Sequence, residues 1–279
     1  MTSFLGGQRR SAEIGSGRVT ASSPNCHHRV AQPGARVQHT RGVSDKLLLC
    51  ELHAHTTWSD GELTLEELVD LYGRSGFDVL CVTDHAVPTN DPRPLAIDSW
   101  TWPAYLAAID REAVRARREY DLLVLPGLEL TDDHDDPTRS AHALSLGLRR
   151  FVSLDYGLET ALEEARSQGA VTVAAHPYTP RDNGVFHATT RFWHDYEDLA
   201  GLIDRYELFN GDRVFGWVAD RDLPPIASGD FHTTDDLSSW KTMLLCEKDE
   251  EAVLALLASR ERVYLAPHVR DTVGVRLAA

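Results

Sequence analysis

The sequence has few features of membrane proteins or of proteins that coat nucleic acid. No apolar run approaches the roughly 20 residues that a helix needs to cross a membrane, so we expect a soluble protein. Lysine and arginine number 28 against 43 aspartates and glutamates, which gives a formal net charge of −15. Binding to long nucleic acid ordinarily requires clustered basic residues, so long nucleic acid is not expected as a partner.

Cysteine is scarce as well, and several nucleophile motifs are missing. Cys26, Cys50, Cys81 and Cys246 form no Cys-x-x-Cys pair, which indicates reduced thiols and a cytoplasmic protein. The chain also lacks the Gly-x-Ser-x-Gly motif of serine hydrolases and the P-loop of nucleotide-binding proteins. Any catalysis must therefore depend on other residues.

The first part of the chain differs in composition from the rest. Residues 1–45 are rich in Arg, Ser, Gly and His, contain six arginines against two acidic residues, and show neither helical nor strand periodicity. This composition predicts a disordered basic N-terminal tail, although an acid-poor start of this kind also resembles a transit peptide. Residues 46–279 are long enough for one α/β barrel domain.

From Leu47 onward, apolar strand-like runs alternate with segments of helical period. The expected strands are Leu47–His55, Asp78–Asp84, Leu122–Leu130, Ala141–Leu148, Val171–His176, Tyr206–Phe209, Pro225–Asp230 and a short terminal one, Arg262–Leu265. One expected helix begins at the capping box of Thr64 and Glu67. Three others span Pro103–Tyr120, Leu158–Ser167 and Asp249–Ala258. This alternation predicts an α/β fold with a parallel, closed sheet.

Two histidines one residue apart end the first expected strand. Residues i and i+2 of a strand point to the same side, so His53 and His55 can reach one metal ion together. Imidazole suits zinc, iron and manganese. A solvated pair is the alternative, so the other strands must supply further ligands.

Five later strands also carry histidine or carboxylate residues, mostly at the ends where a barrel places its functional site. These segments are Thr83-Asp84-His85, Gly127-Leu128-Glu129, Ala141-His142-Ala143, Ala175-His176-Pro177 and Ser228-Gly229-Asp230-Phe231-His232. Any one of them could be a structural polar group, but six such strands together point to a metal cluster.

In these segments the sequence resembles the PHP family, the polymerase and histidinol phosphatase domain, over roughly residues 48–268. The resemblance implies a distorted (β/α)7 TIM-like barrel that holds two to three divalent ions and leaves their identity open among zinc, manganese, iron and magnesium. Carried over by position, the implied ligands are His53, His55, Glu129 and Asp230 for one ion, Glu129, His142 and His176 for a second, and Asp60, His85 and His232 for a third. Asp84 is expected to orient a histidine rather than to bind an ion.

Clustered divalent ions suit the hydrolysis of phosphate esters because they activate water and neutralise charge on the phosphoryl oxygens. The resemblance therefore implies a phosphatase that hydrolyses a small phosphomonoester through a metal-bridging hydroxide, with Glu129 and Asp230 as bridging or bidentate carboxylates. Arg181, five residues after His176, is the preferred phosphate contact, against the alternative of a solvated loop charge. Arg191, Arg213 and Lys241 are further basic residues considered for that role.

Two other functions remain open at this stage. One is a phosphodiesterase or 5'-3' exonuclease that acts on short oligonucleotides, and the other is a non-catalytic metal-binding module. Only residues 130–141 separate Glu129 from His142, too few for the helical insertion of nucleoside-bisphosphate-type relatives, which disfavours a nucleotide substrate. The sequence leaves the oligomeric state open.

Overall fold

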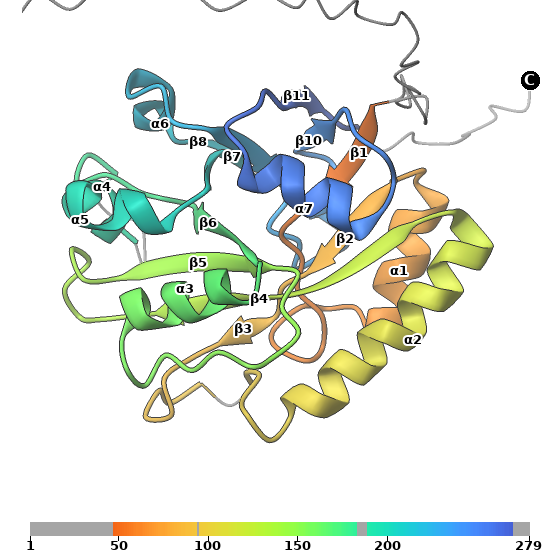
Figure 1. Cartoon of the computed structure of the whole chain (residues 1–279), viewed down its shortest axis with the longest axis horizontal. Coiled ribbons are helices and arrows are strands. Elements are labelled where there is room, and N and C mark those ends of the chain that lie inside the picture. The colour runs from red at the N-terminus through yellow and green to blue at the C-terminus, as the bar shows by residue number, and fades with distance from the viewer. Residues whose placement is uncertain (1–46, 94, 183–188, 270–279) are drawn as a thin grey trace, which may run out of the picture. The chain divides into compact units, whose positions relative to one another are not determined.

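The computed structural model describes residues 47–93, 95–182 and 189–269, and the predicted N-terminal tail lies outside them. The described residues form a curled mixed sheet with helices packed against it (Figure 1). The strands are β1 (Leu48–Glu51), β2 (Val79–Val82), β3 (His85–Ala86), β4 (Leu123–Asp132), β5 (Ala141–Leu146), β6 (Val171–Ala175), β7 (Arg205–Asn210), β8 (Arg213–Val214), β9 (Pro225–Ser228), β10 (Trp240–Leu244) and β11 (Tyr264–Pro267).

The helices lie between these strands in the sequence. They are α1 (Leu65–Arg74), α2 (Trp102–Tyr120), α3 (Leu158–Ser167), α4 (Arg191–His194), α5 (Tyr196–Leu199), α6 (Gly216–Asp220) and α7 (Glu250–Ala258), with short 3-10 turns at Ala200–Leu202 and Thr234–Leu237. Among the described residues, no helix combines the length and the apolar character needed to cross a membrane.

The strand order is β11-β10-β1-β2-β4-β5-β6-β7-β8, with β3 paired to β4 and β9 paired to β7. The prediction of a fully parallel sheet is wrong, because β5 runs antiparallel to both β4 and β6. The physical reason is the connection: the 133–140 segment joins β4 to β5 as a hairpin, and a parallel neighbour would need a long crossover.

An isolated backbone bridge joins the segments that follow β1 and β9. Ala54, just beyond β1, pairs with Phe231, just beyond β9. The amide of His55 donates to Phe231 O at 2.9 Å, and the amide of Phe231 donates to His53 O at 3.1 Å. These bonds fix the His53–His55 segment beside Asp230.

Both faces of the central strands are buried, which explains their nearly continuous apolar sequences. On β2, Val79 and Cys81 belong to one apolar cluster, whereas Leu80 and Val82 belong to another. The first cluster includes Val253 and Leu257 of α7, and the second includes the buried faces of α1, α2 and α3.

The sequence predicts the long elements well and misses the short ones. The predicted capping box of α1 is present, with the Thr64 side chain and the Glu67 carboxylate each bonded to the other's backbone amide. The missed elements are β3, β8, β10, α4, α5 and α6. Strand β10 escapes notice because Lys241 interrupts its apolar pattern, although this lysine is buried.

A buried arginine joins the sheet to the C-terminal end of α7. The guanidinium of Arg205, only 1 % exposed, donates to the carbonyls of Leu256, Leu257, Ser259 and Glu261 at 2.7–2.9 Å. The last carbonyls of a helix have no partner within the helix, and a cation there also opposes the negative end of the helix dipole.

Replacing this arginine should destabilise the domain. Arg205→Met leaves buried carbonyls without donors and should reduce the free energy of unfolding by about 3 kcal/mol or more, which lowers Tm by roughly 6–12 °C for a domain of this size. Thermal denaturation followed by circular dichroism measures the change. The matched control is Arg117→Ala, which removes an exposed pair with Asp121 and should cost under about 1 kcal/mol. Equal effects of the two changes would contradict the assigned role of Arg205.

Candidate metal centre

The nine sequence-predicted ligands meet at one end of the curled sheet. Each has a side-chain nitrogen or oxygen within 4.0 Å of that of another member. They come from the β1 end, the following loop, β3, β4, β5, the β6 end and the β9 end: His53, His55, Asp60, His85, Glu129, His142, His176, Asp230 and His232.

The deepest group consists of His53, His55, Glu129 and Asp230. The Nε2 atoms of both histidines lie 3.4 Å from Glu129 Oε2, and they lie 3.2 and 3.4 Å from Asp230 Oδ1. Ligands about 2.1 Å from a tetrahedrally bound ion lie about 3.4 Å from one another, so this spacing suits a small cation.

Unsatisfied polar atoms support the same conclusion. His53 Nε2, His55 Nε2 and Asp230 Oδ1 are buried and make no hydrogen bond within the described part of the chain. Burying such atoms without a partner is costly. Their convergence fits a divalent metal ion that accepts two imidazoles and a carboxylate.

A second group lies nearer the surface. Asp60 Oδ1 is 3.4 Å from His85 Nε2 and 3.3 Å from His232 Nε2, and the Asp60 side chain is 56 % exposed. His55 joins this group as well as the deep one. The resemblance assigns His55 to the first ion alone, whereas the structure places it within reach of both groups.

A third group joins His53, Glu129 and His176, and His142 lies outside all three. His142 Nδ1 lies 3.0 Å from Glu129 Oε1, as its predicted place requires, but its Nε2 lies 3.0 Å from Asp133 Oδ1. The other oxygen of Asp133 accepts from Arg93 at 2.9 Å. The sequence analysis missed this contact, for which the acidic run Thr131–Asp136 beside His142 was the available signal.

Two candidate ligands have backbone conformations that non-glycine residues rarely adopt. Asp230 has φ 51° and His176 has φ 27°. Such residues persist only where surrounding contacts hold them, and they concentrate at functional sites. His176 is held in part by its amide, which donates to Glu207 Oε2 at 2.6 Å.

Glu207 contacts two candidate ligands and was not identified from the sequence. It is fully buried in β7, and its Oε1 accepts from His53 Nδ1 at 3.0 Å and from Ser228 Oγ. A proton on Nδ1 leaves Nε2 free to bind a metal, so Glu207 selects the tautomer that the deep group needs. Its one sequence signal is a glutamate in an otherwise apolar run.

Asp84 supports the loop that follows His55. Its carboxylate accepts from the Thr56 amide and hydroxyl at 2.8 Å and from Ser59 Oγ at 2.6 Å. Ser59 Oγ in turn lies 3.4 Å from His55 Nδ1. Gly61 completes this turn, because a Cβ there would lie 2.4 Å from His55 O.

The histidines of the cluster differ in the direction in which their surroundings shift the pKa. Burial, together with the charges of His85 and His232, lowers the pKa of His55 to about 3. Burial also opposes the charged forms of His85 and His232, but Glu129 and Asp60 raise the pKa of His85 to about 10, and Asp60 and Asp230 raise the pKa of His232 to about 9. Burial raises the pKa of Glu129, but the surrounding histidines more than offset it and leave that pKa well below its ordinary value.

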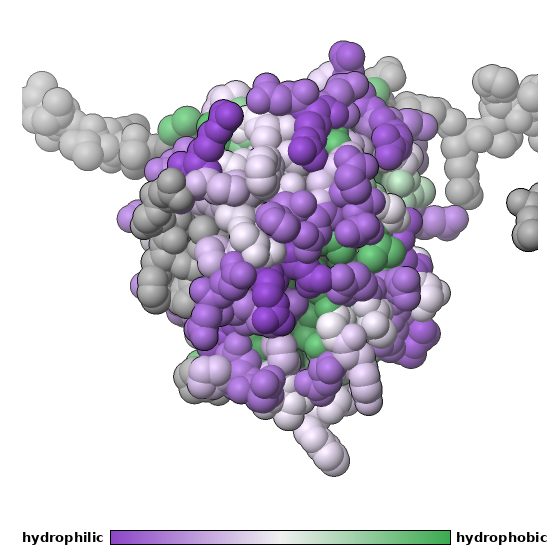
Figure 2. Space-filling model, turned by 90° about the vertical axis from the view of Figure 1, so that its left-hand side faces the viewer, coloured by the Kyte–Doolittle hydropathy of each residue, from purple (hydrophilic) through white to green (hydrophobic). Residues whose placement is uncertain are grey.

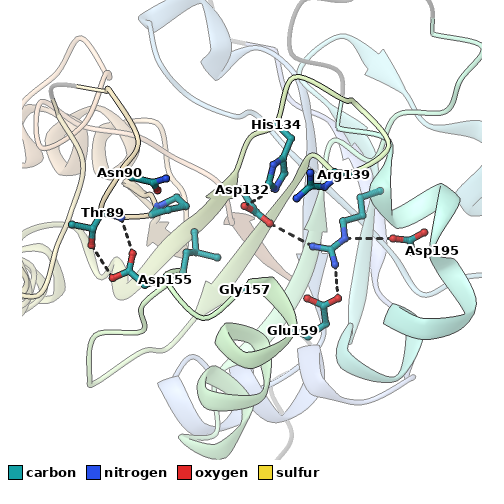
Figure 3. A pocket seen from close by; sticks show the side chains of 12 residues that line it. Thr89, Asn90, Asp132, His134, Arg139, Asp155, Gly157, Glu159 and Asp195 are labelled. Carbon is teal, nitrogen blue, oxygen red and sulfur yellow. Dashed lines mark hydrogen bonds and ion pairs between the residues drawn. The ribbon is translucent and has the colours of Figure 1, made fainter.

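The basic residues considered for phosphate binding lie in different surroundings. Lys241 is fully buried and paired with Glu51, so it is not available to bind a phosphate. Arg191 is held by Asp132, Glu159 and Asp195 in a pocket of about 790 Å³ at the tip of the β4–β5 hairpin (Figure 3). No candidate ligand lines that pocket.

The two remaining arginines form no ion pair in the described part of the chain. Arg181 lies in a cleft of about 630 Å³ with Trp193 and Trp217, and none of the nine ligands lines that cleft. Arg213 lies instead in a cleft of about 400 Å³ that Asp230 also lines, and its guanidinium carbon lies 5.5 Å from the centre of the Tyr178 ring. Of these two arginines, Arg213 is therefore the one whose cleft is also lined by a candidate ligand.

Figure 2 shows the hydropathy of one face of the molecule. The face at the left of Figure 1, near α4, α5 and α6, is mainly hydrophilic in Figure 2, and its apolar side chains form small separate areas.

Comparison with solved structures identifies the fold. A two-domain protein from Bacteroides vulgatus that contains a predicted PHP-like metal-dependent phosphoesterase matches with a TM-score of 0.59 and 20 % identity, over 84 % of this chain and 70 % of that one. The chain therefore has a TIM-like fold of the PHP type, which confirms the predicted resemblance at the level of the fold.

Two further structures match less closely. A protein from Bifidobacterium adolescentis, described as a putative metal-dependent phosphoesterase, has a TM-score of 0.44 and 17 % identity, over 67 % of this chain and 88 % of that one. An amidohydrolase from Chromobacterium violaceum has a TM-score of 0.45 and 16 % identity, over 66 % and 88 %. No family model and no curated protein matches the chain.

Metal binding should release protons at neutral pH. At pH 7 the metal-free protein holds protons on His85 and His232, whose pKa values are raised to about 10 and about 9, and a metal-bound imidazole must lose its proton. Binding that fills the Asp60 group should release about two protons, and its affinity should rise with pH up to those pKa values. Calorimetric titration with ZnCl2 in buffers of different ionisation enthalpy measures the release. The control is His232→Ala, which should release about one proton fewer at pH 7; no release by the wild-type protein would contradict the prediction.

Proposed function

We propose that the protein is a metal-dependent phosphatase that hydrolyses a small phosphomonoester. The observation that carries the proposal is the convergence of His53 Nε2, His55 Nε2 and Asp230 Oδ1, three buried atoms without hydrogen-bond partners, around the carboxylate of Glu129. The PHP-type fold of the chain supports it, because the Bacteroides protein with that fold contains a predicted metal-dependent phosphoesterase.

Two to three divalent ions, from among zinc, manganese, iron and magnesium, would be held by the nine candidate ligands. When bound, such ions activate water and neutralise the charge of a phosphoryl group. Glu129 places one oxygen near His53 and His55 and the other near His142 and His176, so its carboxylate is suited to bridge two ions.

We place the protein in a reducing, cytoplasmic setting because Cys50, Cys81 and Cys246 are free.

The chain's own residues supply order and charge around the ester. Glu207 fixes the tautomer of His53, and Asp84 fixes the loop that positions His55 and Asp60. A phosphate that reaches the metals past Asp230 would enter the cleft lined by Arg213, whose guanidinium suits phosphate oxygens. Arg181 remains the alternative contact if the substrate extends into its separate cleft.

A substrate panel tests the proposal. Protein with measured metal content should hydrolyse p-nitrophenyl phosphate faster than bis(p-nitrophenyl) phosphate, and EDTA should abolish the activity. His176→Ala should lower kcat/KM by at least about 100-fold, because it removes a predicted ligand beside Glu129. His194→Ala, a change at an exposed histidine on α4, is the control and should leave kcat/KM unchanged.

The outcomes of this panel separate the functions. Preference for the diester would favour a phosphodiesterase or an exonuclease on short oligonucleotides. Metal-loaded protein that is inert on every ester would favour a non-catalytic metal-binding module.

The two free arginines can be distinguished by matched substitutions. Arg213→Met should raise KM for the monoester about 10- to 100-fold, as expected for the loss of a charged hydrogen bond worth about 1.5–3 kcal/mol. Arg181→Met should change KM by less than about threefold if its cleft remains empty during turnover. Steady-state kinetics on both variants at equal metal content measures this. The reverse order would return the phosphate contact to Arg181.

A further inference from the structure

Beneath the metal centre, one buried carboxylate joins the two backbone segments that carry His53 and Asp230. Glu51, at the end of β1, is fully buried. Its Oε1 accepts from the His53 amide at 3.2 Å and from the Gly229 amide at 2.9 Å. These amides are 176 residues apart in the sequence, one in a ligand and the other immediately before one.

The second oxygen of Glu51 is held by different partners. Tyr72 donates its hydroxyl to Oε2 at 3.0 Å, and the ammonium of Lys241 on β10 pairs with the same oxygen. The side chains of Glu51 and Lys241 are both fully buried. A buried carboxylate is costly without a counter-charge, and Lys241 supplies that counter-charge to Glu51 between two strands.

The pair also leaves no space for a side chain at Gly229. A Cβ there would lie 2.4 Å from Lys241 Nζ, 2.7 Å from Glu51 Oε2 and 2.9 Å from Asp236 O. The next residue, Asp230, has the uncommon φ of 51°. Lys241 and Glu51 therefore pack directly against the Gly229–Asp230 turn and leave room only for glycine at position 229.

We propose that Glu51, held by Lys241, is a positioning residue that sets the distance between the His53 and Asp230 ligand atoms and thereby the affinity for metal. In the structure His53 Nε2 and Asp230 Oδ1 lie 3.2 Å apart. A single oxygen that accepts both amides fixes the two segments relative to each other before any ion binds. This role rests on the metal-binding part of the proposed function and is independent of the substrate.

Two double variants isolate the contribution of the acceptor. Glu51→Ala/Lys241→Met and Glu51→Gln/Lys241→Met both remove the buried ion pair without leaving a lone charge, but only the Gln variant retains an oxygen for the two amides. We expect the Ala variant to bind Zn2+ about 10- to 100-fold more weakly than wild type, the range typical of residues that orient metal ligands. The Gln variant should remain within about threefold of wild type. Competition with a fluorescent zinc chelator measures the dissociation constants.

Stability controls separate positioning from general destabilisation. Arg205→Met should destabilise the fold through contacts at the end of α7, so its zinc affinity should match wild type. If it loses zinc affinity as strongly as the Ala variant at equal loss of Tm, the specific role of Glu51 is wrong. Equal, wild-type affinity in both double variants overturns the proposal as well.

A conservative substitution covers the case in which the Ala variant does not fold. Glu51→Asp retains the charge opposite Lys241 but shortens the side chain by one methylene, so one carboxylate can no longer reach both amides. Weaker zinc binding is expected, and unchanged affinity would refute the role. Wild-type protein that binds no zinc would instead refute the metal-centre proposal, so the two failures are distinguishable.

Discussion

The rest of the site depends on the contacts that the Glu129 carboxylate makes with the surrounding histidines. Its Oε2 lies 3.4 Å from the Nε2 atoms of His53 and His55 and 2.9 Å from His85 Nδ1. Its Oε1 lies 3.0 Å from His142 Nδ1 and 3.1 Å from His176 Nε2. One buried side chain thus contacts five histidines contributed by four separate parts of the sheet. Such a cluster is stable only if its charges are balanced by protons or by metal ions.

A layer of buried acids beneath the ligands makes this arrangement possible. Glu51 fixes the backbone of the His53 and Asp230 segments, Glu207 fixes the His53 ring and the His176 backbone, and Asp84 fixes the loop after His55. Each accepts several hydrogen bonds from backbone or side chain. Ligand geometry is therefore set by groups that do not themselves enter the predicted ligand set, as metal sites generally require.

The sequence brought the nine candidate ligands and Asp84 into one predicted site, but it did not reveal the other acids that support them. Histidines and carboxylates at several strand ends pointed to a cluster, because parallel strands present their carboxyl ends at one edge, and the full set of nine residues was what the resemblance to the PHP family implied. The reversed direction of β5 was missed because an apolar strand pattern carries no information on direction. Glu51, Glu207 and Asp133 were missed because their partners are mostly distant in the sequence, and no local pattern distinguishes a buried acceptor from a solvated acid.

The candidate ligands differ in how far their side chains are exposed to solvent. His53 and His55 are fully buried, whereas Asp60 is 56 % and His232 is 32 % exposed. A ligand arriving from solvent therefore meets the Asp60 group before the deep group. The raised pKa values are not confined to this exposed group, because nearby carboxylates outweigh the effect of burial at His85 and His232 and also at His53 of the deep group. Bound cations would take over, at either depth, the charge balance that these protons supply.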